Sequence, residues 1–301
     1  MRQWFDGCDY PGDSQTQECN DRCQWELTDA TCRSECGVLN RTGLDAEICV
    51  PGGDVIMEPG WENGTTATAT VSTFVIDRYD VSVGAYGACV AAGACDASNR
   101  VERTEPFLSA FCASPSTTCP DDGPDVGALV TRSAAVAFCT WAGGRLPTLA
   151  EWTLAGRGYA PRASRFPWWN GVTGPGSNDH YGCDTLPSQM ANAGCTDRQP
   201  TFESRVDEFP ESASPFGVEG LLGTYFDGQW LLDRRVEDDA DFVAVYDASV
   251  DPVATAADGS CFTATRGGYT YYESTLVDRR RYCGGSEESD WLEFRCVREV
   301  P

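Results

Sequence analysis

The sequence contains no lysine, so all 22 of its basic residues are arginines, set against 46 aspartates and glutamates. The resulting net charge of -24 repels phosphates at long range and argues against a nucleic-acid partner. No run of about 18 apolar residues occurs, so we expect no transmembrane segment. Residues 1–13 lack the apolar stretch that marks a signal peptide, and we expect a processed or truncated start if the protein is exported.

Metal-binding and catalytic patterns are also scarce. His180 is the only histidine, and no two cysteines have the Cys-x-x-Cys spacing that is typical of zinc sites. A single histidine does not supply a convincing Ser/His/Asp or Cys/His set. We therefore expect His180 to be a surface loop residue.

Cysteine itself is abundant, with 16 residues, an even number, spread along the whole chain. Cytosolic proteins keep their thiols few and reduced, whereas paired cysteines persist in oxidising compartments. The sequence therefore predicts disulfides and a secreted, extracellular or cell-surface location.

Residues 1–50 hold six of these cysteines in a stretch too short to bury a core of its own. Within it Cys19 and Cys23 stand four apart, as do Cys32 and Cys36, and positions four apart share one helical face. This spacing suggests two short helices bridged from Cys19 to Cys36 and from Cys23 to Cys32, although other pairings are open.

Residues 51–301 form the predicted main domain. Its Val, Thr and aromatic residues predict strands over 66–86, and apolar residues at helical spacing predict a helix within 131–144. Thr148 and Glu151 have the spacing of a capping box, which predicts a second helix start. Farther on we expect loops and short strands, including in the acidic run 236–252.

Six strings, in order, resemble the formylglycine-generating enzyme (sulfatase-modifying factor) family. They are FVIDRYDVSVGAYGACV at 74–90, AAVAFCTWAGGRLPTLAEW at 134–152, RFPWWNG at 165–171, FGVEGLLG at 216–223, TRGGY at 265–269 and FRCVRE at 294–299. The resemblance covers about 54–301, and its most specific element is WAGGRLPTLAEW.

The resemblance implies an α+β, C-type lectin-like fold with little regular secondary structure, here preceded by a small Cys-rich, disulfide-stapled segment. Family members that carry cysteines in the two strings containing Cys139 and Cys296 join them. A bond between these two residues would tie the C-terminal strand to the first helix of the domain.

The family's enzymes oxidise a substrate cysteine with copper held by two cysteines that follow the RGGS string. Here those positions fall on Tyr272 and Val277, neither of which offers a thiolate for Cu(I). Cys283 lies nearby, but we expect it to be half of a structural disulfide. Relatives that use non-haem iron need a histidine cluster, which His180 alone does not supply.

Calcium is the remaining cofactor that the resemblance implies. Asn192 and the carbonyl of Ala193 match one of the family's two calcium-binding strings. At the other, Thr224 and Gly220 depart from the usual ligands and only Asp227 keeps a carboxylate. The sequence thus predicts at most one intact calcium site, made of oxygen ligands.

A ligand-binding face is expected on the loops that follow the RGG string and on the matched Trp-rich loop, because Tyr, Trp and Arg favour recognition surfaces. The candidates are Trp168, Trp169, Tyr269, Tyr271, Tyr272 and Arg279. The alternative is that half of the tyrosines are core residues and that the arginines pair with the protein's own carboxylates.

The first functional hypothesis is a non-catalytic extracellular recognition or structural module, with a protein or glycan partner at the cell surface or with self-assembly. The alternative is a copper-dependent formylglycine-generating oxidase with displaced active-site residues. A third is a subunit of an extracellular filament or matrix in which residues 1–50 dock on a neighbour.

Overall fold

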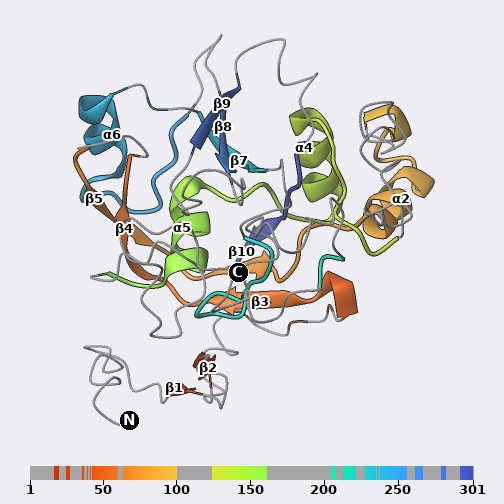
Figure 1. The fold of residues 1–301 in the computed structure, drawn as a ribbon, viewed down its shortest axis with the longest axis horizontal. Coiled ribbons are helices and arrows are strands. Elements are labelled where there is room, and N and C mark those ends of the chain that lie inside the picture. Colours follow the sequence, from red (N-terminus) through yellow and green to blue (C-terminus); the bar gives the residue numbers. More distant parts are fainter. Residues whose placement is uncertain are drawn as a thin grey trace, which may run out of the picture.

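The computed structural model describes residues 17–19, 25–27, 36, 39, 41, 43–59, 64–99, 124–160, 205–207, 213–221, 228–234, 236, 238–255, 262–266, 279–282 and 292–300. Within these residues, short strands come first along the chain, helices α2, α4 and α5 follow, and the remaining strands and helix α6 lie after them (Figure 1). The described strands form four antiparallel sheets of two or three strands each. This mixed architecture confirms the predicted α+β class.

One sheet joins the two ends of the main domain. Its central strand β6 (Phe74–Asp77) pairs with β3 (Glu47–Val50) on one side and with β10 (Val297–Glu299) on the other. The sheet therefore includes residues 47–50, which the sequence-based division assigns to the N-terminal segment.

The cysteine-rich segment differs from the prediction. Its described parts are two antiparallel strands, β1 (Gln17–Cys19) and β2 (Trp25–Leu27), and Cys36 is bonded to Cys49. The predicted Cys19–Cys36 bond is therefore wrong, and Cys19 lies in a strand where a helix was predicted. Most of the remaining predicted helical hairpin lies outside the described residues. The spacing was ambiguous, because positions four apart share a face in a strand as well as in a helix. Cys23 and Cys32 lie outside the described residues.

The two helices predicted from the sequence are confirmed. Helix α4 (Arg132–Trp141) begins where the side chain of Thr131 accepts a hydrogen bond from the amide of Ala134. Helix α5 (Leu149–Arg157) has a complete capping box, in which Thr148 and Glu151 each accept a hydrogen bond from the other's amide.

Two further helices occupy segments where strands or loops were expected. Helix α2 (Val83–Ala91) starts after the cap Ser82, so the predicted strand region ends earlier than expected. Helix α6 (Asp239–Tyr246) forms within the acidic run, capped by Asp238. Acidic side chains in a first turn are favourable because they face the positive end of the helix dipole.

The main core lies where α5 packs on the hairpin of β4 (Gly53–Met57) and β5 (Ala67–Val71). Trp152 of α5 is fully buried in it. A second cluster, between α2 and α4, contains the Cys139–Cys296 disulfide, which confirms the predicted bond. No helix among the described residues is long and apolar enough to cross a membrane.

Candidate functional site

Most of the residues that the sequence nominates for binding or metal coordination lie outside the described part of the chain. They are Trp168, Trp169, Tyr269, Tyr271, Tyr272, Asn192, Ala193 and Asp227. Arg279 is placed only as the first residue of strand β9 (Arg279–Tyr282). These assignments therefore stay predictions, and the described residues locate the framework that carries them.

That framework is the sheet of β7 (Gly228–Arg234), β8 (Phe262–Arg266) and β9. In its antiparallel register Gly228 is opposite Arg266, and Thr265 is opposite Arg279. The segment that precedes Gly228 and the segment 267–278 therefore join the sheet at the same end.

A buried polar cluster fixes the position of β7, the first strand of this sheet. The guanidinium of Arg295, which is fully buried, donates to Asp80 Oδ1 at 2.8 Å and to the carbonyl of Glu219 at 2.7 Å. Gln229 Oε1 accepts from Arg295 Nε at 2.9 Å and from Trp152 Nε1 at 3.0 Å. Because these buried groups satisfy one another, the cluster holds β7 rigidly against α5 and the C-terminal segment.

Gly220 borders this cluster, at a position where the family resemblance implies a calcium ligand. Its φ of +70° favours glycine, and a Cβ added there would lie 3.0 Å from Asp80 Oδ2 and 3.5 Å from Arg295 Nη2. A guanidinium and its carboxylate partner thus occupy the adjoining space. Within the described residues, no group of three or more His, Cys, Asp or Glu side chains is arranged to hold a metal ion.

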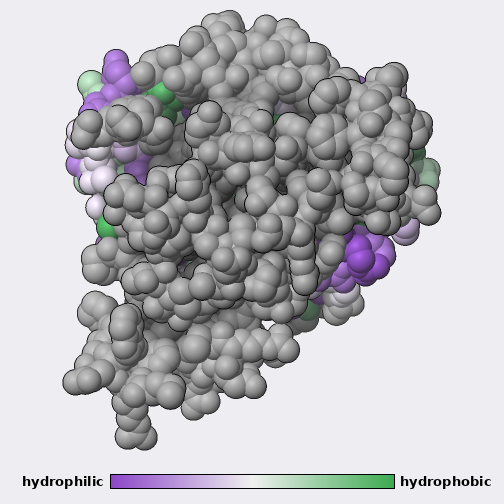
Figure 2. Space-filling model, viewed as in Figure 1, coloured by the Kyte–Doolittle hydropathy of each residue, from purple (hydrophilic) through white to green (hydrophobic). Residues whose placement is uncertain are grey.

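A second charged cluster lies where β3 and β6 meet. The described residues visible in Figure 2 include hydrophilic patches at the edges of this face of the molecule. Arg298 forms a two-pronged ion pair with Glu47, with nitrogen–oxygen distances of 2.8 and 2.9 Å. Asp77 accepts from the amide of Cys296 at 2.8 Å and lies 3.8 Å from Arg41. Burial raises the pKa of Asp77 from 3.8 to about 7, although the Cys296 amide and Arg41 both lower it.

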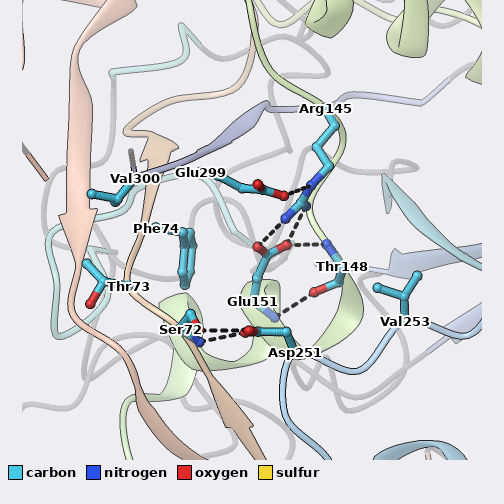
Figure 3. Close-up of a pocket in the computed structure, with 10 residues that line it drawn as sticks. All are labelled: Ser72, Thr73, Phe74, Arg145, Thr148, Glu151, Asp251, Val253, Glu299 and Val300. Atoms are coloured by element: carbon cyan, nitrogen blue, oxygen red, sulfur yellow. Dashed lines mark hydrogen bonds and ion pairs between the residues drawn. The ribbon is translucent and has the colours of Figure 1, made fainter.

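A pocket of about 360 Å³ opens at the end of the β6–β10 pair (Figure 3). Four separate chain segments line it: the β5–β6 turn and the start of β6, the first turn of α5 with the residues before it, the segment after α6, and the end of β10. The lining residues are Ser72, Thr73, Phe74, Arg145, Thr148, Glu151, Asp251, Val253, Glu299 and Val300.

The charged groups of the pocket are held by hydrogen bonds, many of which Figure 3 displays. Arg145 grips both oxygens of Glu151 at 2.7 Å, and its Nε lies 3.7 Å from Glu299. Asp251 accepts from the amide and the hydroxyl of Ser72 at 2.6 and 2.7 Å.

Sequence reasoning did not identify this pocket. Arg145 and Glu151 lie in the most specific string, where Glu151 is predicted only as part of a capping box and Arg145 has no predicted role. Asp251 and Glu299 had no local signal, because the pocket exists only once the turn before Phe74, helix α5 and the C-terminus come together.

Solved structures share this fold. The structure of PvdO from Pseudomonas aeruginosa superposes over 85% of this chain and 95% of its own, with a TM-score of 0.57 and 20% sequence identity. Treponema denticola variable protein 1 superposes over 88% of this chain and 98% of its own, with a TM-score of 0.57 and 14% identity. At these identities the likeness shows the fold alone.

Curated relatives are named formylglycine-generating enzymes. The Thermomonospora curvata protein is 31% identical over 42% of this chain and 53% of its own length. The Mus musculus protein is 33% identical over 39% of this chain and 33% of its own length. The chain thus spans about half or less of the length of these relatives.

The family model described as the sulfatase-modifying factor enzyme 1-like domain matches residues 34–300. This range includes the sheet that joins the two ends of the domain, both core clusters and the pocket, and it exceeds the range of the sequence strings. The chain therefore belongs to the sulfatase-modifying factor enzyme 1-like (FGE-sulfatase) family.

Proposed function

We propose that this protein is a non-catalytic extracellular member of its family that serves as a recognition or structural module. The proposal rests on the observation that Tyr272 and Val277 occupy the positions where the family's copper-binding cysteines are expected. A phenol and an alkyl group do not provide the soft thiolates that Cu(I) prefers, so the residues do not fit the metal.

The described disulfides support an oxidising location. Three bonds, Cys36–Cys49, Cys89–Cys95 and Cys139–Cys296, lie within the described residues. Such bonds persist in extracellular and cell-surface proteins and are rare in the reducing cytosol. Sulfur thus braces the fold, which suits a secreted module.

The partner-binding face is proposed at the end of the β7–β8–β9 sheet where Arg266 and Arg279 lie. The connection between these residues carries Tyr269, Tyr271 and Tyr272, whose rigid rings offer contact area at low entropic cost. A protein or glycan at the cell surface, or a second copy of the chain, suits such a face. Calcium at Asn192 and Ala193 belongs to the same proposal.

The alternative, a formylglycine-generating oxidase with displaced residues, is favoured by the names of the curated relatives. A turnover assay separates the two. The full chain is incubated with copper, oxygen and a cysteine-containing peptide, and conversion of the thiol to an aldehyde is followed by mass spectrometry.

We expect no turnover by the wild-type chain and no tight Cu(I) binding. The matched gain-of-ligand control is the variant Tyr272→Cys with Val277→Cys, which restores two thiolates and is expected to bind Cu(I). Turnover by the wild-type chain that Cys283→Ser abolishes would overturn the proposal in favour of the oxidase.

A further inference from the structure

The pocket in Figure 3 has an excess of negative charge. Glu151, Asp251 and Glu299 contribute three carboxylates, and Arg145 contributes the one guanidinium among the lining residues. Since Arg145 already grips Glu151 with two short hydrogen bonds, its charge is compensated within the wall. The remaining two carboxylates give the pocket a negative potential, which the net charge of -24 reinforces.

The hydrogen-bonding capacity of the wall is also unbalanced. Two of the lining residues direct their donors at protein oxygens: Arg145 donates to Glu151 and to the carbonyl of Leu146, and Ser72 donates to Asp251. Glu299, whose side chain is 82% exposed, lies 3.7 Å from the Nε of Arg145, its one ion-pair partner among the residues that the structure describes. Because each carboxylate oxygen accepts up to about two hydrogen bonds, Glu299 and Asp251 keep acceptor capacity. The pocket therefore suits a ligand that donates hydrogen bonds to these carboxylates.

Apolar side chains complete the wall. Phe74 is buried at the start of β6, directly opposite Glu299 in the register, and Val253 is 38% exposed. Val300 follows Glu299 at the end of the C-terminal strand. A volume of about 360 Å³ suits a ligand of amino-acid size, with an aliphatic stem against these side chains and a polar head at the carboxylates.

We propose that this pocket binds a small organic cation that carries a guanidinium or primary ammonium group on an aliphatic stem. The head group donates hydrogen bonds to Glu299 and Asp251, and the stem lies against Phe74, Val253 and Val300. None of the residues that line this pocket is among those proposed for the recognition face, and the proposal does not depend on whether the protein is an enzyme.

The test titrates the full chain with butylguanidinium, using calorimetry for affinity and amide chemical shifts for location. We expect one site, with shifts at Thr73, Arg145 and Val300. The variant Glu299→Gln removes one head-group acceptor charge from an exposed side chain and is expected to weaken binding about three- to fivefold. In the double variant with Asp251→Asn, affinity is expected to fall by more than about tenfold. Asparagine tolerates the φ of +47° at this position.

Two controls separate a built site from cations gathered by an acidic surface. Asp45→Asn makes the same charge change at an exposed carboxylate that does not line the pocket, and it is expected to leave affinity unchanged. Butyltrimethylammonium has the same stem and charge but no N–H donor, so we expect it to bind at least about tenfold more weakly. Equal losses in Glu299→Gln and Asp45→Asn, equal affinity for the two cations, or no binding would each overturn the proposal.

A third ligand identifies the source of the cation. Arginine blocked at both its amino and carboxyl groups mimics an arginine side chain within a polypeptide. Binding at least as tight as that of butylguanidinium assigns the pocket to a partner's side chain. Binding that is about tenfold weaker assigns it to a free amine or guanidine, and both results support a cation site.

Discussion

Asp77 is the described residue whose titration has the clearest consequence for stability. Its carboxyl lies at the end of β6 among Arg41, Arg295, Glu47 and the amide of Cys296, and burial raises its pKa to about 7. Because the folded-state pKa lies above the ordinary value of 3.8, the folded state binds a proton that the unfolded state has lost. The stability that Asp77 contributes to the folded state is fully present below about pH 4 and is lost as the pH rises through about 7.

The variant Asp77→Asn tests this sign. Between pH 5 and pH 8, the wild-type free energy of unfolding is expected to fall by roughly 2–3 kcal/mol through Asp77 alone. Asparagine keeps an acceptor for the Cys296 amide but does not ionise, so its curve against pH is expected to be flatter by that amount. Guanidinium chloride unfolding of both proteins at the two pH values measures the difference.

Other carboxyls with a raised pKa, Glu219 and Asp233, are present in both proteins and cancel in this comparison. The control Asp45→Asn removes an exposed carboxylate and is expected to keep the wild-type slope. Parallel curves for the wild type and Asp77→Asn would show that Asp77 ionises at an ordinary pH.

At the scale of elements, the helices divide into those that the sequence could predict and those that it could not. Helices α4 and α5 carry both apolar spacing and a capping threonine, and both were predicted. Helix α6 was missed because its acidic run looked like solvated loop, although Asp238 has the chemistry of a helix cap. Helix α2 was missed because Val81 and Val83 favour strands, whereas the Ser82 cap starts a helix.

Asp238 provides a clean measure of capping, because it is exposed and its side chain accepts from the amide of Asp241 at 2.9 Å. We expect Asp238→Ala to lower the free energy of unfolding by about 1 kcal/mol, since the amide loses its partner. Asp238→Ser keeps a capping oxygen and is expected to lose only a few tenths of that amount. Equal losses in thermal or denaturant unfolding would assign the effect to charge rather than to capping.

At the scale of the whole molecule, the sequence predicted the fold family and the Cys139–Cys296 bond, but not how distant segments meet. The pairing of β3 and β10 with β6 joins residues that are far apart in the chain, and strand patterns do not specify partners. The pocket has the same origin, because Ser72, Arg145, Asp251 and Glu299 converge only through this pairing and the packing of α5. The predicted aromatic face stays a prediction, and the register of β7, β8 and β9 describes only the strands that flank part of it.

The Cys139–Cys296 bond bears on the stability of the whole domain, because it joins α4 to the C-terminal strand across 157 residues. The Cys89–Cys95 bond closes a separation of only 6 residues and is the natural comparison. If disulfides act by restricting the unfolded chain, replacing Cys139 and Cys296 by alanine costs about 5 kcal/mol, and replacing Cys89 and Cys95 costs about 2 kcal/mol.

Guanidinium chloride unfolding of the two double-alanine variants measures these losses. Cys139, Cys296 and Cys89 are buried and Cys95 is partly buried, so packing losses are similar in the two variants and largely cancel. A larger loss for the long-range pair therefore indicates chain restriction. It would mean that this bond holds the C-terminal strand on the domain, together with the pocket residues Glu299 and Val300. Equal losses would contradict that role and would assign the stabilisation to local contacts around each sulfur pair.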